Sequence, residues 1–322
     1  MKFQPYPIQF YPILKDRIWG GEKLKTFLHK PITSLITGES WEISTVENDI
    51  SIVSNGFYSD SSLNELLSVY PKEVLGTDVY EKFGTQFPLL FKFLDAKQDL
   101  SIQVHPNDVL AKKRHNTFGK TEMWYVMQAD EGSKIIVGFN ENSSSEEYLH
   151  YLKNKSLTSI LKEIPVKVGD VFFLETGTIH AIGAGIVVAE IQQTSDITYR
   201  VYDFDRKDAN GNERELHIDL ALEAINYNTT KSQKHYSKNT NVSNEIVDCP
   251  FFTINFIPLD GKYECVKNEN HFRVYMCVDG FFELEYNKVI LKYKKGDTLL
   301  IPAAMESFFM IGKGSLLEIY IS

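Results

Sequence analysis

Short apolar blocks bounded by turn residues recur along most of the chain. They include FPLLFKFLD, MWYVM, KIIVGF, VGDVFFLE and GIVVAEIQQ, and they follow one another at fairly even intervals. Short strands separated by turns in this way are typical of an all-β sandwich or barrel. The pattern therefore predicts a mainly β fold.

Three stretches carry the apolar spacing of helices instead. Residues 61–76 begin with a Ser62–Glu65 capping box, and their leucines share one face. A second helical stretch begins at residues 144–147, and SLTSILKEI is expected to continue it. ELHIDLALEAINY is a third, short candidate. These segments predict a few helices at the periphery of the β structure.

A polar segment without periodicity, residues 229–245, is the best linker candidate. Beyond it two motifs return in the same order. GDVFFLETGTIH (169–180) is matched by GDTLLIPAAMES (296–307), and EMWYVMQAD (122–130) by HFRVYMCVD (271–279). We interpret this weak self-similarity as two related units. Gly-Asp turns are common between strands, so the alternative of a chance match stays open.

Composition narrows the classes of partner. The 322 residues are 43% apolar and carry a formal charge of −9, which argues against nucleic acid or an acidic membrane as partner. No apolar run approaches about 18 residues, and the first residues do not read as a secretory signal. The three cysteines show no C-x-x-C spacing, so a cytoplasmic location is expected.

Four side chains are candidates for one metal site. Gln103 and His105 stand two residues apart, so on a strand both point to the same face. Glu122 opens a second strand-like run and His180 closes a third. Two imidazoles, one amide oxygen and one carboxylate suit zinc, with manganese, iron or cobalt as alternatives. The following histidines are expected to be ordinary packed or exposed residues: His29, His115, His150, His217 and His235.

Two motifs carry a resemblance to a known family. Gln103-x-His105 replaces the His-x-His of most cupins, and AEIQQTSDITYRVYDFDR (189–206) resembles the segment E-x-x-Q-x-S-D-x-T-Y-R-x-Y-D. Both are similar to the type I mannose-6-phosphate isomerases (phosphomannose isomerases) of the cupin superfamily, in their short bacterial form. The resemblance implies two cupin (jelly-roll) β-barrels with a few peripheral helices. Residues 1–240 would form the catalytic, metal-binding domain and residues 241–322 a barrel without metal.

The same resemblance implies an activity. The family's intramolecular oxidoreductases interconvert D-mannose 6-phosphate and D-fructose 6-phosphate by metal-assisted proton transfer through an enediol. It implies one zinc ion per chain, a small sugar phosphate as partner, and a monomer or weak homodimer.

The residues that match family positions receive the corresponding roles. Catalytic roles fall on Arg200, Lys120 and Glu190, and substrate contacts on Lys97, Arg17 and Trp19, with Trp41 in a further matching segment. If the 189–206 segment is one strand without a bulge, Glu190 and Arg200 share a face.

Two other functions remain open on the sequence. One is a non-catalytic cupin that binds sugar phosphates, although a degenerate module is expected to have lost some of the four ligands. The other is a different metal-dependent cupin enzyme. An iron oxygenase more often has two histidines and one carboxylate, without Lys and Arg for a phosphate.

Overall fold

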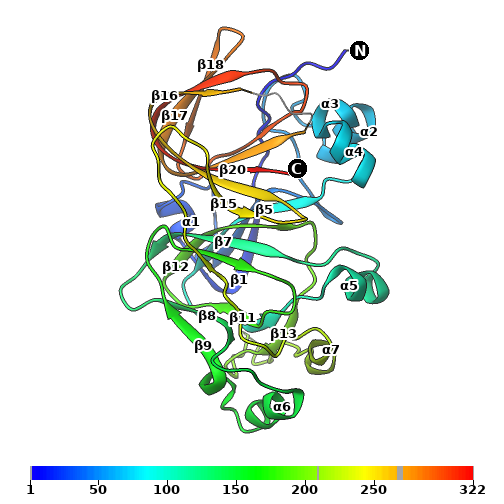
Figure 1. The fold of residues 1–322 in the computed structure, drawn as a ribbon, viewed down its shortest axis with the longest axis vertical. Coiled ribbons are helices and arrows are strands. Elements are labelled where there is room, and N and C mark those ends of the chain that lie inside the picture. The colour runs from blue at the N-terminus through cyan, green and yellow to red at the C-terminus, as the bar shows by residue number, and fades with distance from the viewer. Residues whose placement is uncertain (1, 209, 267–270, 322) are drawn as a thin grey trace.

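The computed structural model describes residues 2–208, 210–266 and 271–321, which form two β-rich units stacked end to end (Figure 1). Helices lie at the edges of both units, so the predicted mainly β fold is confirmed. None of the helices within these ranges is long and apolar enough to cross a membrane.

Three main sheets organise the described residues. The first has the order β1 (Ile13–Gly21), β2 (Thr37–Ile43), β5 (Leu89–Ala96), β12 (Ile186–Gln193), β7 (Glu122–Ala129), β10 (Val171–Leu174) and β14 (Gln233–Lys234). The second has the order β13 (Tyr199–Tyr202), β6 (Ile102–Val104), β11 (His180–Ile182), β8 (Lys134–Phe139) and β9 (Leu161–Pro165). Together these two sheets make the first unit.

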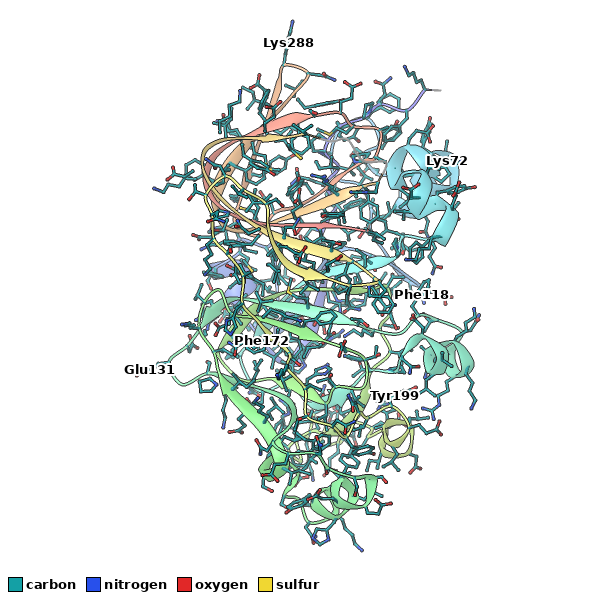
Figure 2. All side chains as sticks on the ribbon, in the orientation of Figure 1. Lys72, Phe118, Glu131, Phe172, Tyr199 and Lys288 are labelled. Carbon is teal, nitrogen blue, oxygen red and sulfur yellow. The ribbon has the colours of Figure 1, made fainter. Side chains whose placement is uncertain are left out.

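The second unit is built on the third sheet. Its order is β15 (Asn244–Asp248), β16 (Thr253–Cys265), β20 (Phe308–Tyr320), β17 (Arg273–Tyr286) and β18 (Val289–Lys294), and β19 (Thr298–Ile301) also pairs with β17. A small separate pair is formed by β3 (Thr45–Val46) and β4 (Asp49–Ile50). Figure 2 shows side chains filling both units, with Lys288 at the tip of the β17–β18 hairpin.

The helices of the described chain are short. They are α1 (Lys23–Thr26), α2 (Leu63–Val69), α3 (Pro71–Leu75), α4 (Thr77–Phe83), α5 (Asp108–His115), α6 (Ser145–Lys153) and α7 (Ile218–Leu222), with a 3₁₀ turn η1 (Leu157–Ile160). The Ser62–Glu65 capping box is confirmed at the start of α2. The expected extension of the 144–147 helix through SLTSILKEI is wrong, because η1 gives way to strand β9, which completes the edge of the second sheet.

The central strands β5 and β12 are buried on both faces, which explains their unbroken apolar sequences. Phe91, Phe93 and Ile191 face a large apolar core that continues into the second unit. The alternate residues, including Leu94 and Val188, face the interior of the first unit. A charged side chain on that inner face therefore needs a partner, since a lone buried charge is costly.

One apolar core spans both units. It includes Phe87 and Phe272, whose ring centroids lie 5.0 Å apart, and Tyr125, which stacks on Phe256 at 5.9 Å. The N-terminal segment also crosses over, because Ile8 exchanges two backbone hydrogen bonds with β19. The division of the chain at residue 240 stays a prediction, and the apolar contacts across it are extensive.

Two Gly-Asp turns repeat the same hydrogen bonds in the two units. The Gly169-Asp170 turn exchanges two backbone bonds of 2.9 Å with Val126, and the Gly296-Asp297 turn exchanges two of 2.9 Å with Cys277. Both glycines have a positive φ, 87° and 93°, which glycine adopts without steric cost. The strand order β2–β5–β12–β7 corresponds to β15–β16–β20–β17. The units are therefore related in topology and in local hydrogen bonding.

These turns also fix the register of the repeat. Since Val126 corresponds to Cys277, Glu122 corresponds to Arg273. The sequence match of 122–130 with 271–279 was therefore wrong by two residues. A shift of two keeps every side chain on its original face of a strand, so the apolar pattern alone does not detect it.

A buried glutamate occupies corresponding places in the two units. In the second, Glu318 on β20 lies between its strand neighbours and accepts hydrogen bonds from Asn255 Nδ2 at 3.1 Å and Tyr275 Oη at 2.6 Å. Arg273 Nη1 adds a third bond at 2.9 Å. In the first unit the corresponding residue is Glu190.

Replacing Glu318 with Ala should lower the free energy of unfolding by about 3–5 kcal/mol, because it removes one partner from a buried ion pair. Glu318 exposes only 2% of its surface. Urea unfolding followed by far-UV circular dichroism measures the change. Glu283→Ala is the matched control, because Glu283 forms a solvent-exposed ion pair with Lys292 at 3.2 Å. This substitution should lower the free energy of unfolding by only about 0–1 kcal/mol. Equal losses in the two variants would contradict the assignment.

Candidate active site

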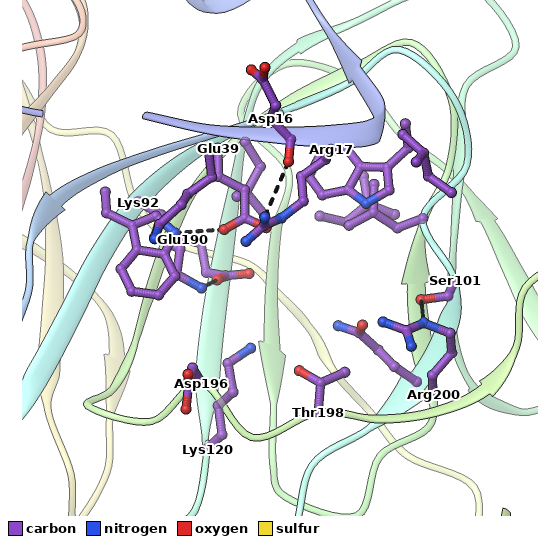
Figure 3. Close-up of a pocket in the computed structure, with 18 of the residues that line it drawn as sticks. Asp16, Arg17, Glu39, Lys92, Ser101, Lys120, Glu190, Asp196, Thr198 and Arg200 are labelled. Carbon is purple, nitrogen blue, oxygen red and sulfur yellow. Dashed lines mark hydrogen bonds and ion pairs between the residues drawn. The ribbon is translucent and has the colours of Figure 1, made fainter. Parts of the chain in front are cut away.

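A cavity of about 540 Å³ in the first unit is lined from both of its sheets (Figure 3). The seven-stranded sheet contributes residues of β1, β2, β5, β7 and β12, and the second sheet contributes residues of β6, β11 and β13. The charged residues that line it are Lys15, Asp16, Arg17, Glu39, Asp49, Lys92, Lys120, Glu190, Asp196, Arg200 and Arg214. So dense a set of charges suits a polar, charged ligand.

Three predicted metal ligands converge next to this cavity, behind its lining residues Gln103 and Lys120. One donor atom each from His105, Glu122 and His180 lies within 4.8 Å of the others, and all three residues are buried. Glu122 begins β7, as predicted, whereas His180 begins the short strand β11 instead of closing the preceding apolar run. Gln103 on β6 lies opposite His180 in the strand register.

Backbone carbonyls orient both imidazoles. His105 Nδ1 lies 2.9 Å from Ile197 O, and His180 Nδ1 lies 2.8 Å from Thr178 O. A nitrogen that faces a carbonyl oxygen carries the proton, so each Nε2 is left with a free electron pair. Such an outer hydrogen bond is usual for a histidine that binds a metal.

Glu122 is the strongest local sign of a cation site. Its Oε1 lies 3.3 Å from His180 Nε2, and no hydrogen bond to that oxygen is present in the described part of the chain. Two electron-pair donors thus face each other in a buried place, which a positive ion would relieve. The donor set of two imidazoles and a carboxylate fits a divalent metal.

Burial determines the protonation of these groups. It lowers the pKa of His180 to about 4, and with the charge of Lys120 it lowers the pKa of His105 well below its usual range. Burial raises the pKa of Glu122 to about 7, although Lys120 acts in the opposite direction. The imidazoles are therefore neutral, as metal ligands must be.

Gln103 lies beside the three ligands without completing the set in its present rotamer. Its Nε2 is 3.3 Å from His180 Nε2. A half-turn of the amide exchanges Nε2 with Oε1, and the two orientations are assigned from hydrogen bonding. The residue is thus in place to offer an oxygen.

Lys120 lies in the loop before β7 and points back to the cluster. Its Nζ is 2.7 Å from Glu122 Oε2 and 3.1 Å from His105 Nε2. Burial acts to lower its pKa, but Glu122 and Glu190 outweigh this effect and raise it. Two donor atoms of the cluster, one from Glu122 and one from His105, therefore already contact a positive charge.

Glu190 on β12 carries the central ion pair of the cavity. Its Oε1 accepts from Lys92 Nζ at 3.0 Å and its Oε2 accepts from Trp124 Nε1 at 2.9 Å (Figure 3). Burial opposes ionisation, but Lys92 and Lys120 prevail and lower the pKa of Glu190 to about 2. The carboxylate is ionised and is fixed in place by both bonds.

Arg200 lies at the other end of the cavity, on β13. Its Nε donates to Ser101 Oγ at 3.3 Å and its Nη1 to Glu215 O at 2.8 Å. No carboxylate pairs with Arg200 in the described chain. Its pKa is lowered mainly by burial and also by the positive charge of Arg214. A guanidinium in this setting is available to an anionic ligand.

Two further arginines gather near Arg200 around a single acid. Arg206 Nη2 and Arg214 Nη2 each lie 2.5 Å from Asp203 Oδ1, and Arg214 Nε lies 2.7 Å from Asp203 Oδ2. Two guanidiniums thus share one carboxylate, and Arg200 lies near them without a carboxylate partner of its own in the described chain. Of the three, Arg200 and Arg214 line the cavity, so this end has an excess of positive charge.

The predicted substrate-contact residues divide into two groups. Arg17 and Trp19 line the cavity, together with Trp41. Trp19 is only 4% exposed and belongs mainly to the apolar core of the first unit. Lys97 does not line this cavity; it borders a separate surface pocket with Arg206. The structure therefore gives the predicted phosphate contact of Lys97 no support.

The 189–206 segment is not one continuous strand, so the expected shared face of Glu190 and Arg200 is wrong. Strand β12 ends at Gln193, the chain then leaves the first sheet, and Arg200 belongs to β13 of the second sheet. Both residues nevertheless reach the same cavity, from opposite sides. The backbone has to cross between sheets, and strand alternation does not persist through such a crossing.

Sequence reasoning missed several groups that line the cavity. The most informative is Lys92, a lysine in the middle of the buried run FPLLFKFLD, which had to have an acidic partner. Glu39 was also missed. It accepts from Arg17 Nε at 2.7 Å and from Trp41 Nε1 at 2.6 Å. The chain around Glu39 carries no comparable signal, because polar residues flank it.

Two family models match the chain. Residues 8–136 match the catalytic domain of type I phosphomannose isomerase, and residues 243–321 match the cupin domain of mannose-6-phosphate isomerase. The chain is 36% identical over 310 residues to the mannose-6-phosphate isomerase ManA of Bacillus subtilis, covering 95% of this chain and 96% of that protein. It is 36% identical over 305 residues to the mannose-6-phosphate isomerase of Streptococcus mutans, covering 94% of each.

Solved structures show the same likeness. The crystal structure of the mannose 6-phosphate isomerase from Bacillus subtilis matches with a TM-score of 0.90 at 33% identity, covering 99% of this chain and all of the other. The apo form of the enzyme from Salmonella typhimurium matches with a TM-score of 0.79 at 16% identity, which shows a common fold. The predicted cupin-family fold and the family resemblance are confirmed.

Replacing His180 with Ala should remove most of the tightly bound metal, because it deletes one of three converging donors. Metal content of the purified protein, measured by plasma mass spectrometry, tests this directly. His150→Ala, a change of an exposed histidine on α6, is the control and should retain the metal of the wild type. Full metal content in folded His180→Ala protein would rule out the site.

Proposed function

This chain belongs to the type I phosphomannose isomerase family and interconverts mannose 6-phosphate and fructose 6-phosphate, and we propose that the cavity of its first unit performs this aldose–ketose isomerisation. The observation that carries the proposal is the meeting of three features at one cavity. Gln103, Lys120 and Arg200 line the same space, and the buried donor cluster lies directly behind Lys120, whose ammonium contacts Glu122 and His105.

We propose one zinc ion per chain, held by Gln103, His105, Glu122 and His180. Neutral imidazoles, an amide oxygen and one carboxylate suit zinc. When bound, zinc would act as a Lewis acid toward the oxygens of the sugar. The uncompensated Oε1 of Glu122 supports a cation at this point.

Lys120 is assigned to proton transfer. The isomerisation removes a proton from C2 and returns one to C1, while another proton moves from the C2 hydroxyl to the C1 oxygen. An ammonium can protonate a sugar oxygen, and once neutral it can accept a proton. The place of Lys120 beside the donor cluster gives it access to the groups that react.

Glu190 remains a catalytic candidate with a narrower task. A carboxyl with a pKa of about 2 is a weak proton acceptor at neutral pH. Its two bonds instead hold Lys92 and the indole of Trp124 in the cavity wall. We therefore propose that Glu190 keeps these groups in place against the substrate.

The arginine-rich end is proposed to hold the negative charge of the substrate. Arg200 and Arg214 line the cavity there, and the single carboxylate of Asp203 pairs with Arg206 and Arg214 but not with Arg200. A phosphate that binds here would receive charge-assisted hydrogen bonds. This assignment replaces the one made for Lys97.

The remaining proposals concern the setting of the enzyme. Its three cysteines are free thiols, which supports a cytoplasmic location. The net charge of −9 supports a small metabolite, and not a nucleic acid, as partner. We propose a monomer or weak homodimer. The competing hypothesis is a cupin that binds sugar phosphates without turning them over.

A coupled assay separates these functions. Purified protein loaded with zinc should form fructose 6-phosphate from mannose 6-phosphate, followed by the reduction of NADP through auxiliary enzymes. Removal of the metal by a chelator should abolish the rate, and added zinc should restore it, because a bound metal would supply Lewis-acid stabilisation of the sugar oxygens. Tight binding of mannose 6-phosphate without any product would favour the non-catalytic hypothesis.

Replacing Arg200 or Lys120 with Ala should lower kcat at least about a hundredfold if each acts in the transition state. Bound metal, measured in the same preparations, should stay at the wild-type level for Arg200→Ala. A large rise in KM with unchanged kcat would reassign the residue to uniform binding of the phosphate. Lys97→Ala is the comparison and should leave both constants close to wild type.

A further inference from the structure

We propose that His217, a residue outside the cavity, is a positioning residue for Arg200. The inference rests on the proposed role of Arg200 in the isomerisation. It concerns a histidine that the sequence marks as ordinary, and to which the metal site and the cavity give no role.

Arg200 lies on an edge strand of the second sheet. Strand β13 ends the second sheet and pairs on its inner side with β6, where Arg200 is in register with Gln103. No strand of the described chain pairs with its outer side. An edge residue therefore has a backbone N–H and C=O to satisfy, and its position is less constrained than that of a central residue.

His217 fills this gap by itself. The backbone N–H of Arg200 donates to His217 Nδ1 at 3.1 Å, and the backbone N–H of His217 donates to Arg200 O at 2.7 Å. Both backbone groups of Arg200 are thus held by one residue. These two hydrogen bonds replace the pair that a neighbouring strand would form with Arg200, one through the side chain of His217 and one through its main chain.

The imidazole of His217 binds the backbone of Arg200 and does not cap the helix that follows it. His217 is the residue that precedes α7 (Figure 1), where a side chain commonly accepts a hydrogen bond from the first turn of the helix. Its ring makes no such bond. Since Nδ1 accepts from Arg200, the neutral ring carries its proton on Nε2, 4.0 Å from a carboxylate oxygen of Glu215.

The same short segment also holds the guanidinium. Arg200 Nη1 donates to Glu215 O at 2.8 Å, two residues before His217 in the chain. The backbone and the head of Arg200 are therefore fixed by one loop that enters α7. Loss of the acceptor on His217 would free the strand edge and let the head shift within the cavity. A small displacement of such a group lowers the rate markedly.

Two substitutions separate the acceptor from the bulk of the ring. Asn at position 217 carries Oδ1 where histidine carries Nδ1 and is favoured at the start of a helix. Leu has a similar size and no acceptor. His217→Leu should lower kcat/KM roughly tenfold, as expected for one partly buried donor left without a partner. His217→Asn should stay within about threefold of wild type.

A double-mutant cycle with Arg200→Ala distinguishes positioning from general stability. In the Arg200→Ala background, His217→Leu should cause no further loss of kcat/KM. In the wild-type background, the effect of His217→Leu should fall on the same kinetic constant, kcat or KM, that Arg200→Ala alters. Thermal unfolding and metal content of each variant are measured alongside.

The outcomes separate two failures. If Arg200→Ala changes neither kinetic constant, the proposed role of Arg200 is wrong. If Arg200→Ala is impaired while His217→Leu is fully active, or lowers kcat/KM equally in both backgrounds, the positioning role of His217 is wrong. The same holds if His217→Asn is as impaired as His217→Leu.

Discussion

Charge balance inside the first unit is the constraint on which the site depends. Lys92 and Glu190 pair at 3.0 Å, Lys120 and Glu122 pair at 2.7 Å, and all four are buried. A buried charge without a partner destabilises a protein strongly, so these residues have to be placed together. The four charges cancel. A divalent ion and a phosphate dianion that enter the cavity together therefore leave its total charge near zero.

The sequence was informative where a strand stays in one sheet. The two-residue spacing of Gln103 and His105 and the position of Glu122 at a strand start follow from simple alternation. The fold class follows from the short apolar blocks. The alternation of side chains between two faces no longer applies after Gln193, where the chain changes sheets. The alternation also did not show which lysines line the cavity, and Lys97 does not. A lysine in a strand buried on both faces was a usable signal, since Lys92 needed an acidic neighbour in the sheet.

The second unit shows how the same framework satisfies a buried glutamate with different partners. Glu318 accepts hydrogen bonds from Arg273 and Tyr275 of its own sheet. Arg273 occupies the position that Glu122 has in the first unit. A guanidinium fixed to the chain supplies positive charge at all times. The framework therefore tolerates an exchange of an acidic residue for a basic one, provided that the neighbouring carboxylate is retained.

The apolar core that continues from β5 and β12 into the second unit has a consequence for how the enzyme loses activity. The strands β5 and β12 have no solvent-facing side, and the apolar residues on their outer face pack in one core with residues of the second unit. The two units then unfold cooperatively, because separating them would expose that surface to water. Heat or denaturant that loosens the distant unit would disorder the cavity in the same transition, and a catalytic half expressed alone would tend to aggregate through its uncovered sheet.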